Sequence, residues 1–402
     1  MACYICKNSE LKKILDLGEH PPPLNFLSAK DSKKHKLFPL QLFHCSKCGL
    51  VQLGDAVDPN KLFKKYAYTS GISESFKNHL FSLAELLVKK FELTSNDLVI
   101  DIASNDGTLL QGFAKFNVKV LGIEPSNVAN IAIENGIPTI NDFFDEIVSN
   151  QVLKEYGQAK IITATNIFAH VKKLNSFMKG IKLLLKEDGV YVSESQYLRD
   201  IIEKLEFDTI YHEHLRYYGL KQIVFLLKLY DMEVFHAERI SAQGGSIRVY
   251  SCHKGKFPIS ESVQKILDEE EKLKISHFET LQSFAKCVQE NKKELISLLL
   301  KLKKEGKKIV GIGAPARSCT ILNYCEIGPD ILDFITEKST LKIGKVTPGS
   351  NIIVVADDEL IKIQPDYAFL LSWHFKDSLI PKMKQAGYKG KFIIPLPKVE
   401  VI

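Results

Sequence analysis

Apolar and polar residues follow the order strand, loop and helix over residues 98–144. The segment LVIDIASNDGTLLQGFAKF (98–116) predicts a buried strand, a small polar loop with Gly107 and an amphipathic helix. KVLGIEPS (119–126) predicts a second strand that ends in an acidic residue. This order is typical of the opening of an α/β sheet.

Further strand-like segments follow, at 161–171 and 189–197, and a helix is expected to begin near Gly219. Residues 256–306 predict a long helical stretch that joins two halves of the chain. Beyond it, strands alternate with loops or helices again, in the segments 308–325, 331–337, 350–361, 366–373 and 389–396. The pattern therefore predicts a second α/β layer at the C-terminus.

Composition sets the scale of the protein. With 402 residues, 45% hydrophobic and 25% charged, the chain can build two or three packed domains of about 100–200 residues each. It has no apolar run of about 18 residues, and its start, MACYICKNSE, lacks a secretory pattern. We expect no membrane segment and a cytoplasmic location.

The net charge of +6 comes largely from lysine, as in LLLKLKKEGKKIVGIG (298–313). Such a run is compatible with nucleic-acid binding, but a solvated helix face before a buried strand explains it better. A mild positive charge also suits an anionic small substrate. We expect no nucleic-acid partner.

Four of the eight cysteines form two C-x-x-C pairs, Cys3 with Cys6 and Cys45 with Cys48. Two such turns together supply the four thiolates of a tetrahedral Zn²⁺ site, and Gly49 allows the second turn to be tight. Four protein ligands leave no open position, so we expect a structural zinc. Free reduced cysteines are the alternative.

The loop after the first strand indicates the cofactor. A dinucleotide site needs G-x-G-x-x-G, whereas DIASNDGTLL contains only Gly107. S-adenosylmethionine has no phosphate, and Asp101, Ser104 and Asn105 supply partners for its amino and carboxylate groups. Glu124 follows the loop by about 17–20 residues, the separation at which an acidic side chain meets a ribose. The loop therefore favours S-adenosylmethionine over NAD.

Two later segments extend this site. Phe143 and Phe144, in NDFFDE, are placed to pack against an adenine, although ordinary core packing explains them equally well. Asn166 and His170 follow an apolar strand, and open α/β sheets bind ligands at the carboxyl ends of their strands.

The segment YHEHLRYY (211–218) admits three interpretations. It is an acid/base site, a metal-ligand strip through His212 and His214, or a buried aromatic cluster. No third metal ligand lies nearby in the sequence, which weakens the second interpretation.

An ordered set of motifs resembles one enzyme family. The two C-x-x-C pairs are followed by YAYTSGISESF, DIASNDGTLL, GIEPS, TATNIFAHV, FDTIYHEHLRYYG, GGSIRVY, GIGAPARSCTILNYC, TPGS and LLSWHF. Together they resemble the S-adenosylmethionine-dependent C-methyltransferases that act at C-3 of nucleotide-linked 4-keto-6-deoxysugars. The resemblance runs from Cys3 to about Pro395.

The resemblance implies an α/β protein of three parts. These are a zinc-binding module (1–68), a class I methyltransferase domain with a Rossmann-like core (69–255), and a helical connector with a Rossmann-like C-terminal domain that holds the substrate's nucleotide (256–402). GIGAPA lacks the full dinucleotide spacing, so we expect a turn that contacts the substrate. We expect a monomer.

The resemblance also assigns the chemistry. His214 becomes the base that removes the C-3 proton, a task for a group that titrates near neutrality. Glu213 orients or polarises it, and Tyr211 places a hydroxyl near the sugar oxygens. Tyr68 faces the sugar from the zinc module, with Ser70 as a weaker candidate. Tyr217 and Tyr218 are expected to pack under the helix that follows.

The remaining expected site residues fall into two groups. The cofactor site is expected to comprise Asp101, Ser104, Asn105, Gly107, Glu124, Pro125, Ser126, Asn141, Phe143, Phe144 and Asn166. The substrate site is expected to comprise Ser70, His170, Arg248, Asn323, Tyr324, Lys342 and Lys345.

Two departures from the family pattern matter. Ala103 stands where many class I methyltransferases have glycine, which we expect to be tolerated, and TEKSTLKIGKVTPGS follows the family only loosely. The nucleotide, dTDP, GDP or CDP, therefore stays open. Methylation of a sugar oxygen or of another small molecule is the alternative reaction, and nucleic-acid binding through the cysteine pairs is a distant third.

Overall fold

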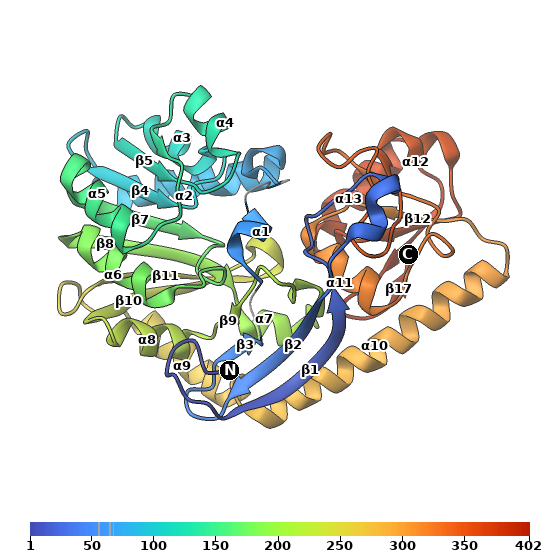
Figure 1. The fold of residues 1–402 in the computed structure, drawn as a ribbon, viewed down its shortest axis with the longest axis horizontal. Helices are drawn as coiled ribbons and strands as arrows, with labels where there is room; N and C mark the ends of the chain where they lie inside the picture. The colour runs from blue at the N-terminus through green and yellow to red at the C-terminus, as the bar shows by residue number, and fades with distance from the viewer. Residues whose placement is uncertain (55–56, 64–65, 67) are drawn as a thin grey trace.

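Three β-sheets organise the chain, as Figure 1 shows for this computed structural model. The structure describes residues 1–54, 57–63, 66 and 68–402. A seven-stranded sheet and a six-stranded sheet form two lobes, and a four-stranded sheet of the N-terminal region lies between and below them. Each α/β lobe has its own buried strands, so the predicted α/β class with two layers of this kind is confirmed.

The seven-stranded sheet contains residues 98–144, which the sequence predicts as the opening of an α/β sheet. Its strand order is β10-β11-β8-β7-β4-β5-β6, and only β11 runs antiparallel to the other strands. The strands are β4 (Leu98–Ile102), β5 (Lys119–Ile123), β6 (Thr139–Ile140), β7 (Ala159–Thr165), β8 (Leu185–Gln196), β10 (Met232–Ile240) and β11 (Ser246–His253).

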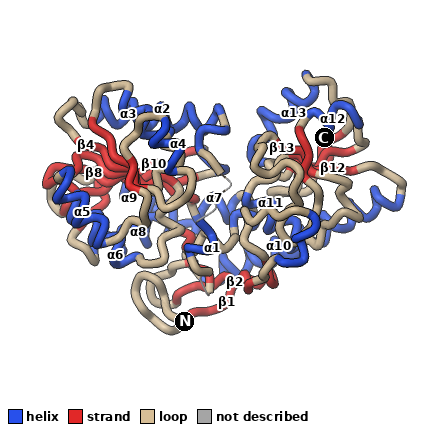
Figure 2. Tube along the Cα trace, turned by 45° about the horizontal axis from the view of Figure 1, so that its top comes forward, coloured by secondary structure: helices blue, strands red, loops and turns tan. Residues whose placement is uncertain are grey.

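Helices cover both faces of this sheet (Figure 2), which explains why every residue of β4 is buried. The helices are α2 (Glu74–Lys90), α3 (Thr108–Ala114), α4 (Ala129–Glu134), α5 (Glu146–Tyr156), α6 (Leu174–Leu184), α7 (Leu198–Glu203) and α8 (Leu220–Lys228). The last of these has Gly219 as its N-cap, as predicted. Strand β4 pairs with β5 on one side and β7 on the other, and this change of direction opens a crevice at the carboxyl ends.

The N-terminal sheet contains one strand from the middle of the chain. It has the order β1-β2-β3-β9, with β1 (Leu11–His20), β2 (Phe38–Cys45), β3 (Val51–Leu53) and β9 (Arg216–Tyr217). Strand β9 lies inside YHEHLRYY and pairs antiparallel with β3. A short helix, α1 (Pro59–Phe63), follows β3. The segment with the candidate base is therefore part of the N-terminal sheet.

The six-stranded sheet forms the C-terminal lobe. Its order is β14-β13-β12-β15-β16-β17, and only the pairing of β16 with β17 is antiparallel. The elements are β12 (Ile309–Ile312), α11 (Ala316–Tyr324), β13 (Ile335–Glu337), β14 (Val354–Ala356), α12 (Asp358–Ile363), β15 (Tyr367–Leu370), α13 (Lys376–Gln385), β16 (Lys391–Ile394) and β17 (Glu400–Val401).

The connector is two helices instead of the single stretch predicted over 256–306. Helix α9 (Glu261–Leu273) ends where Lys274 adopts a left-handed conformation with φ 53°, and α10 (Phe278–Lys304) begins four residues later. A left-handed residue cannot continue a right-handed helix, so the direction changes there. Helix α10 then runs from the N-terminal sheet along the underside of the C-terminal lobe (Figure 1). Its Asn291 donates a hydrogen bond to the Pro395 carbonyl at 2.9 Å.

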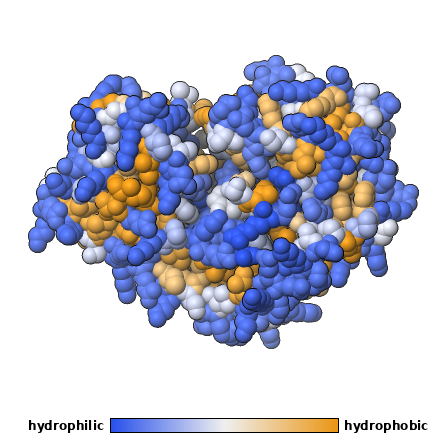
Figure 3. Space-filling view, turned by 180° about the vertical axis from the view of Figure 1, so that it is seen from behind, coloured by the Kyte–Doolittle hydropathy of each residue, from blue (hydrophilic) through white to orange (hydrophobic). Residues whose placement is uncertain are grey.

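The outer surface mixes hydrophilic and apolar side chains. Seen from behind in Figure 3, hydrophilic residues cover most of the face, and apolar ones gather in patches over both lobes. Within the described residues, no helix is long and apolar enough to span a membrane.

The four N-terminal cysteines lie together, as the two C-x-x-C pairs predict. Their sulfur atoms all fall within 4.8 Å of one another, and the Cys3–Cys48 and Cys6–Cys45 separations are both 3.5 Å. Tetrahedral zinc with Zn–S bonds of about 2.3 Å needs sulfur atoms about 3.8 Å apart. The donor set and its spacing therefore fit Zn²⁺.

Replacement of Cys45 tests this site. Cys45 is fully buried, so Cys45→Ser is expected to lower the zinc content well below one ion per chain and to destabilise the N-terminal sheet. Metal analysis and thermal unfolding measure the two effects. Cys287→Ser, on the exposed face of α10, is the matched control and should retain the metal. Full zinc retention in Cys45→Ser would contradict the assignment.

Candidate active site

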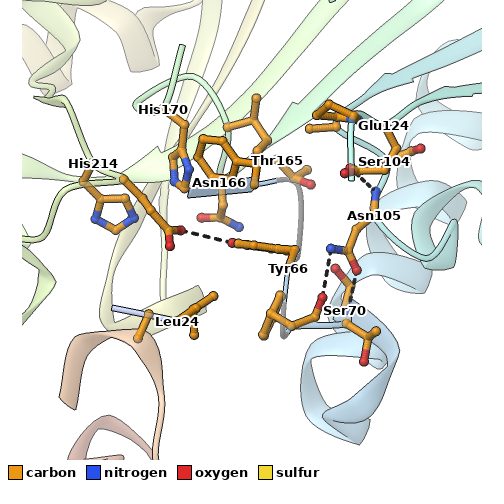
Figure 4. A pocket seen from close by; sticks show the side chains of 18 of the residues that line it. Leu24, Tyr66, Ser70, Ser104, Asn105, Glu124, Thr165, Asn166, His170 and His214 are labelled. Atoms are coloured by element: carbon orange, nitrogen blue, oxygen red, sulfur yellow. Dashed lines mark hydrogen bonds between the residues drawn. The ribbon is translucent and has the colours of Figure 1, made fainter. Parts of the chain in front are cut away.

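One large cavity lies where the three parts of the chain meet. It has a volume of about 820 Å³. The carboxyl ends of β4, β5 and β7 form one wall, residues of the N-terminal region and of the turn at 209–214 form another, and the C-terminal lobe closes the third. Figure 4 shows part of this cavity from close by. The crevice predicted for an open α/β sheet is thus enclosed by two further domains.

The loop after β4 forms the first end of the cavity. Ala103 and Asn105 both have positive φ, 55° and 53°, which turns the loop sharply. The Asn105 amide donates to a Glu124 carboxylate oxygen at 3.0 Å, and the Ser126 amide donates to the other oxygen at 2.9 Å. Glu124 thereby joins the first two strands at their ends and keeps free lone pairs for a ribose.

Asp101 lies at the bottom of the same end. Its carboxylate accepts a hydrogen bond of 2.6 Å from the Thr163 hydroxyl, and burial raises the pKa of this carboxyl to about 7. Ser104 is also buried, and its hydroxyl has no partner among the described residues. Both residues line the cavity, and a hydroxyl and a carboxylate are suitable partners for the amino acid end of S-adenosylmethionine.

The N-terminal segment folds over this loop. The Ser70 amide donates to the Asn105 side-chain oxygen at 2.8 Å, and the Asn105 side-chain nitrogen donates to the Tyr68 carbonyl at 3.3 Å (Figure 4). The Gly71 amide donates to Asp106 at 2.8 Å. Ala67 lies outside the described residues. The cover brings Tyr68 and Ser70 to the cavity, as their candidate roles require.

Most expected cofactor residues line the cavity, and three support it from behind. The residues at the wall are Asp101, Ser104, Asn105, Glu124, Pro125, Phe143, Phe144 and Asn166. Gly107 caps α3 with φ 75° and faces Ala132. The Asn141 side chain donates to the Glu124 and Ser126 carbonyls and so fixes the end of β5. These supporting residues set the shape of the cradle.

The second end of the cavity holds His214. Its Nδ1 donates a hydrogen bond of 2.7 Å to the Thr209 carbonyl, which leaves Nε2 as the nitrogen that accepts a proton. The His214 ring centroid lies 4.0 Å from that of Tyr211 and 4.9 Å from that of His170. Figure 4 shows the two histidines side by side. The tautomer required of a base is therefore set by the backbone.

The pKa values of His214 and Glu213 differ from those expected for a base that titrates near neutrality and its partner. Burial lowers the pKa of His214 to about 3 and raises the pKa of Glu213 to about 8. The apolar surroundings disfavour charge on either group. At pH 7, His214 is neutral and able to accept a proton, and Glu213 is largely protonated.

Tyr66 contributes to this end although the sequence interpretation chose only Tyr68. The Tyr66 hydroxyl lies 3.1 Å from a Glu213 carboxyl oxygen, with its ring 6.3 Å from the Tyr68 ring. Both tyrosines line the cavity. The sequence YAYTS contains both, but only the fold shows which of them reaches Glu213.

The C-terminal lobe supplies two buried cations to the third wall. Lys342, an expected substrate residue, donates to the Ala314 carbonyl at 3.0 Å and lies 3.4 Å from Glu337. Arg317, at the start of α11, was not among the expected residues. Arg317 directly follows GIGAPA. Its place just after a predicted strand is the feature of the sequence that could have indicated a site residue.

Four expected substrate residues lie away from the cavity wall. Arg248 forms ion pairs with Glu194 and Glu238 in the seven-stranded sheet. Asn323 donates to the Cys319 and Pro348 carbonyls, which fixes the turn at TPGS. The Tyr324 ring packs against Phe207 and carries the Lys292 amine above it. Lys345 is half-buried and does not line the cavity.

Family models match three consecutive parts of the chain. A zinc binding domain matches residues 3–63, a methyltransferase domain matches residues 76–237, and a C-methyltransferase C-terminal domain matches residues 241–397. The C-methyltransferase NovU of Streptomyces niveus is 29% identical over 404 residues, which cover 100% of this chain and 96% of that protein.

Solved structures match part of the chain at low identity. PH0226 of Pyrococcus horikoshii is 17% identical, covers 50% of this chain and 100% of that chain, and has a TM-score of 0.37. Magnesium protoporphyrin IX methyltransferase of Synechocystis, solved with S-adenosylmethionine, is 12% identical with a TM-score of 0.34 and covers 44% of this chain and 79% of that chain. The chain is thus similar over its whole length to a C-methyltransferase, and its consecutive parts match a zinc binding domain, a methyltransferase domain and a C-methyltransferase C-terminal domain.

Proposed function

We propose that this C-methyltransferase methylates C-3 of a nucleotide-linked 4-keto-6-deoxysugar through an enolate. The observation that carries the proposal is the neutral His214, whose proton-accepting Nε2 belongs to the same cavity as the cofactor loop. A carbon can be methylated once a base has removed its proton, and a neighbouring carbonyl makes that proton acidic. The motif resemblance in the sequence supplies the sugar class.

The two ends of the cavity would bind the methyl donor and the sugar, respectively. S-adenosylmethionine, when bound, supplies an electrophilic methyl group on a sulfonium. The Asp101 and Glu124 end would hold that donor, and the turn at Tyr211–His214 would hold the sugar between donor and base. Such alignment contributes much of the rate enhancement in two-substrate reactions.

The C-terminal wall suits the nucleotide part of the substrate. The first helical residues of α11 and the buried amine of Lys342 present positive charge to the cavity. Diphosphate oxygens are stabilised by backbone N–H groups at a helix start and by a lysine amine. Residues Ser339 and His374 add polar atoms to the same wall.

Solvent exchange separates this function from methylation of an oxygen. With a nucleotide-linked 4-keto-6-deoxysugar in deuterated water and without methyl donor, the enzyme is expected to replace the C-3 hydrogen by deuterium, read by mass spectrometry or NMR. Adding S-adenosylmethionine should then increase the product mass by one methyl group. Methylation without any C-3 exchange would favour the O-methyltransferase alternative.

Replacing His214 tests the base. His214→Asn is expected to lower kcat and C-3 exchange by about 10²–10⁴-fold, the usual contribution of general acid–base catalysis, and to keep the affinity for S-adenosylmethionine. Calorimetry measures that affinity. His212→Asn is the matched control, because His212 points away from the cavity and bonds to the Phe38 carbonyl. Unimpaired turnover by His214→Asn would exclude this base.

The pH profile tests the division of roles between His214 and Glu213. His214, with a pKa of about 3, stays deprotonated throughout neutral pH, so no acidic decline should appear near pH 6.5. Glu213 loses its proton as pH rises through about 8, and its negative charge would then oppose enolate formation.

The rate is therefore expected to decline above about pH 8, and Glu213→Gln, which cannot ionise, should remove that decline. The measurement is kcat/KM from pH 5 to 10. A rate that instead rises through pH 8 in the wild type and is lost in Glu213→Gln would make Glu213 the base.

A further inference from the structure

Arg317 is a buried cation that neither the motifs nor the family matches assign to the reaction. It is the second residue of α11, and 7% of its surface is exposed. Its Nη2 donates to a Glu206 oxygen at 2.8 Å, and its Nε lies 3.5 Å from an Asp208 oxygen. Its Nη1 has no hydrogen-bond acceptor among the described residues. The Arg317 side chain also lines the cavity.

The guanidinium lies at the reacting end of the cavity. Burial dominates the pKa values of His214 and Tyr211, but the charge of Arg317 contributes to both, which requires proximity. Lys342, the other buried cation of this wall, is already hydrogen-bonded to the Ala314 carbonyl and paired with Glu337. Lys342 keeps its third N–H for the diphosphate, whereas it is Arg317 whose charge contributes to the pKa values of His214 and Tyr211.

On the basis of the proposed function, we infer that Arg317 is a catalytic residue that stabilises the enolate oxygen at C-4 of the sugar. When His214 Nε2 takes the C-3 proton, the C–H electron pair forms the C-3=C-4 bond, and the carbonyl π pair moves to the C-4 oxygen. That oxygen then accepts from the free Nη1. When C-3 forms its bond to the methyl group, the pair on oxygen returns to restore the carbonyl, and the carbon–sulfur bond breaks with its pair left on sulfur.

Stabilisation of the enolate oxygen by Arg317 matters because His214 is a weak base. A base whose pKa is about 3 removes a carbon-bound proton only if the resulting anion is strongly stabilised. A fixed guanidinium inside a dry cavity provides such stabilisation without reorganisation of water. Glu206 and Asp208 offset its charge and hold it in place.

Kinetics of Arg317 variants test the inference. Arg317→Gln is expected to lower kcat and the C-3 exchange rate by about 10²–10³-fold, as for loss of an oxyanion donor, with KM for the nucleotide sugar nearly unchanged. Arg317→Lys keeps the buried charge balance and should fold normally, with an intermediate loss because lysine lacks the fork. A raised KM with wild-type kcat would show that Arg317 binds phosphate instead, and would overturn the inference.

Glu206→Gln tests whether Arg317 acts in catalysis or only stabilises the junction between the lobes. This variant removes one carboxylate partner but leaves the guanidinium in the wall, so exchange is expected to stay much closer to wild type than in Arg317→Gln. Equal losses in the two variants would mean that Arg317 only holds the domains together. Fluorescence of Trp373, whose indole donates to Asp208 at 2.7 Å, reports whether the junction is intact.

The wild type shows whether the proposed function fails or only the role of Arg317. If the wild type neither exchanges nor methylates any nucleotide-linked 4-keto-6-deoxysugar in a panel with dTDP, GDP and CDP, the proposed function fails, and with it the inference. If the wild type exchanges and Arg317→Gln exchanges equally fast, the inference alone fails.

Discussion

The pairing of two residues, Arg216 and Tyr217, with strand β3 is the contact on which the active site depends. The Leu53 amide donates to the Leu215 carbonyl at 2.9 Å, and the Leu215 amide donates to the Ala169 carbonyl at 3.0 Å. These bonds place His214 between the N-terminal sheet and the loop that carries His170. A shift of 1 Å at a reacting group costs about a hundredfold in rate, so this junction has to be rigid.

Arg216 strengthens the junction and links it to the metal site. Its side chain is 1% exposed and donates to the Phe168 and Val171 carbonyls, while its guanidinium lies 5.0 Å from the ring centroid of Tyr4. Tyr4 lies between the first two cysteines of the zinc site. Four thiolates around one Zn²⁺ carry net negative charge, which helps a buried cation nearby. The zinc site thereby supports the turn that carries His214 through the ring of Tyr4.

The sequence predicts those parts of the site that depend on local chemistry. The cysteine spacing, the loop after β4 and the position of Glu124 follow from short-range geometry, and the structure has them as expected. Tyr66, Arg317 and the supporting roles of Arg248 and Asn323 depend on contacts between residues up to 147 positions apart, as for Tyr66 and Glu213. A single sequence contains no measure of such distances, so an arginine that pairs in a sheet and one that lines a cavity look alike in it.

Burial also explains why the titration behaviour could not be predicted from residue type. A histidine and a glutamate with ordinary pKa values of about 6.5 and 4.3 would both be charged between those two pH values. Enclosure by three domains makes charge costly, so the pair is neutral at pH 7 and the positive charge of the reacting end resides on Arg317, balanced by Glu206 and Asp208. In the proposed function, His214 is a weak, oriented base and Arg317 a fixed cation. Removal of a proton from carbon would require this combination, because the resulting anion is stabilised on oxygen before carbon attacks.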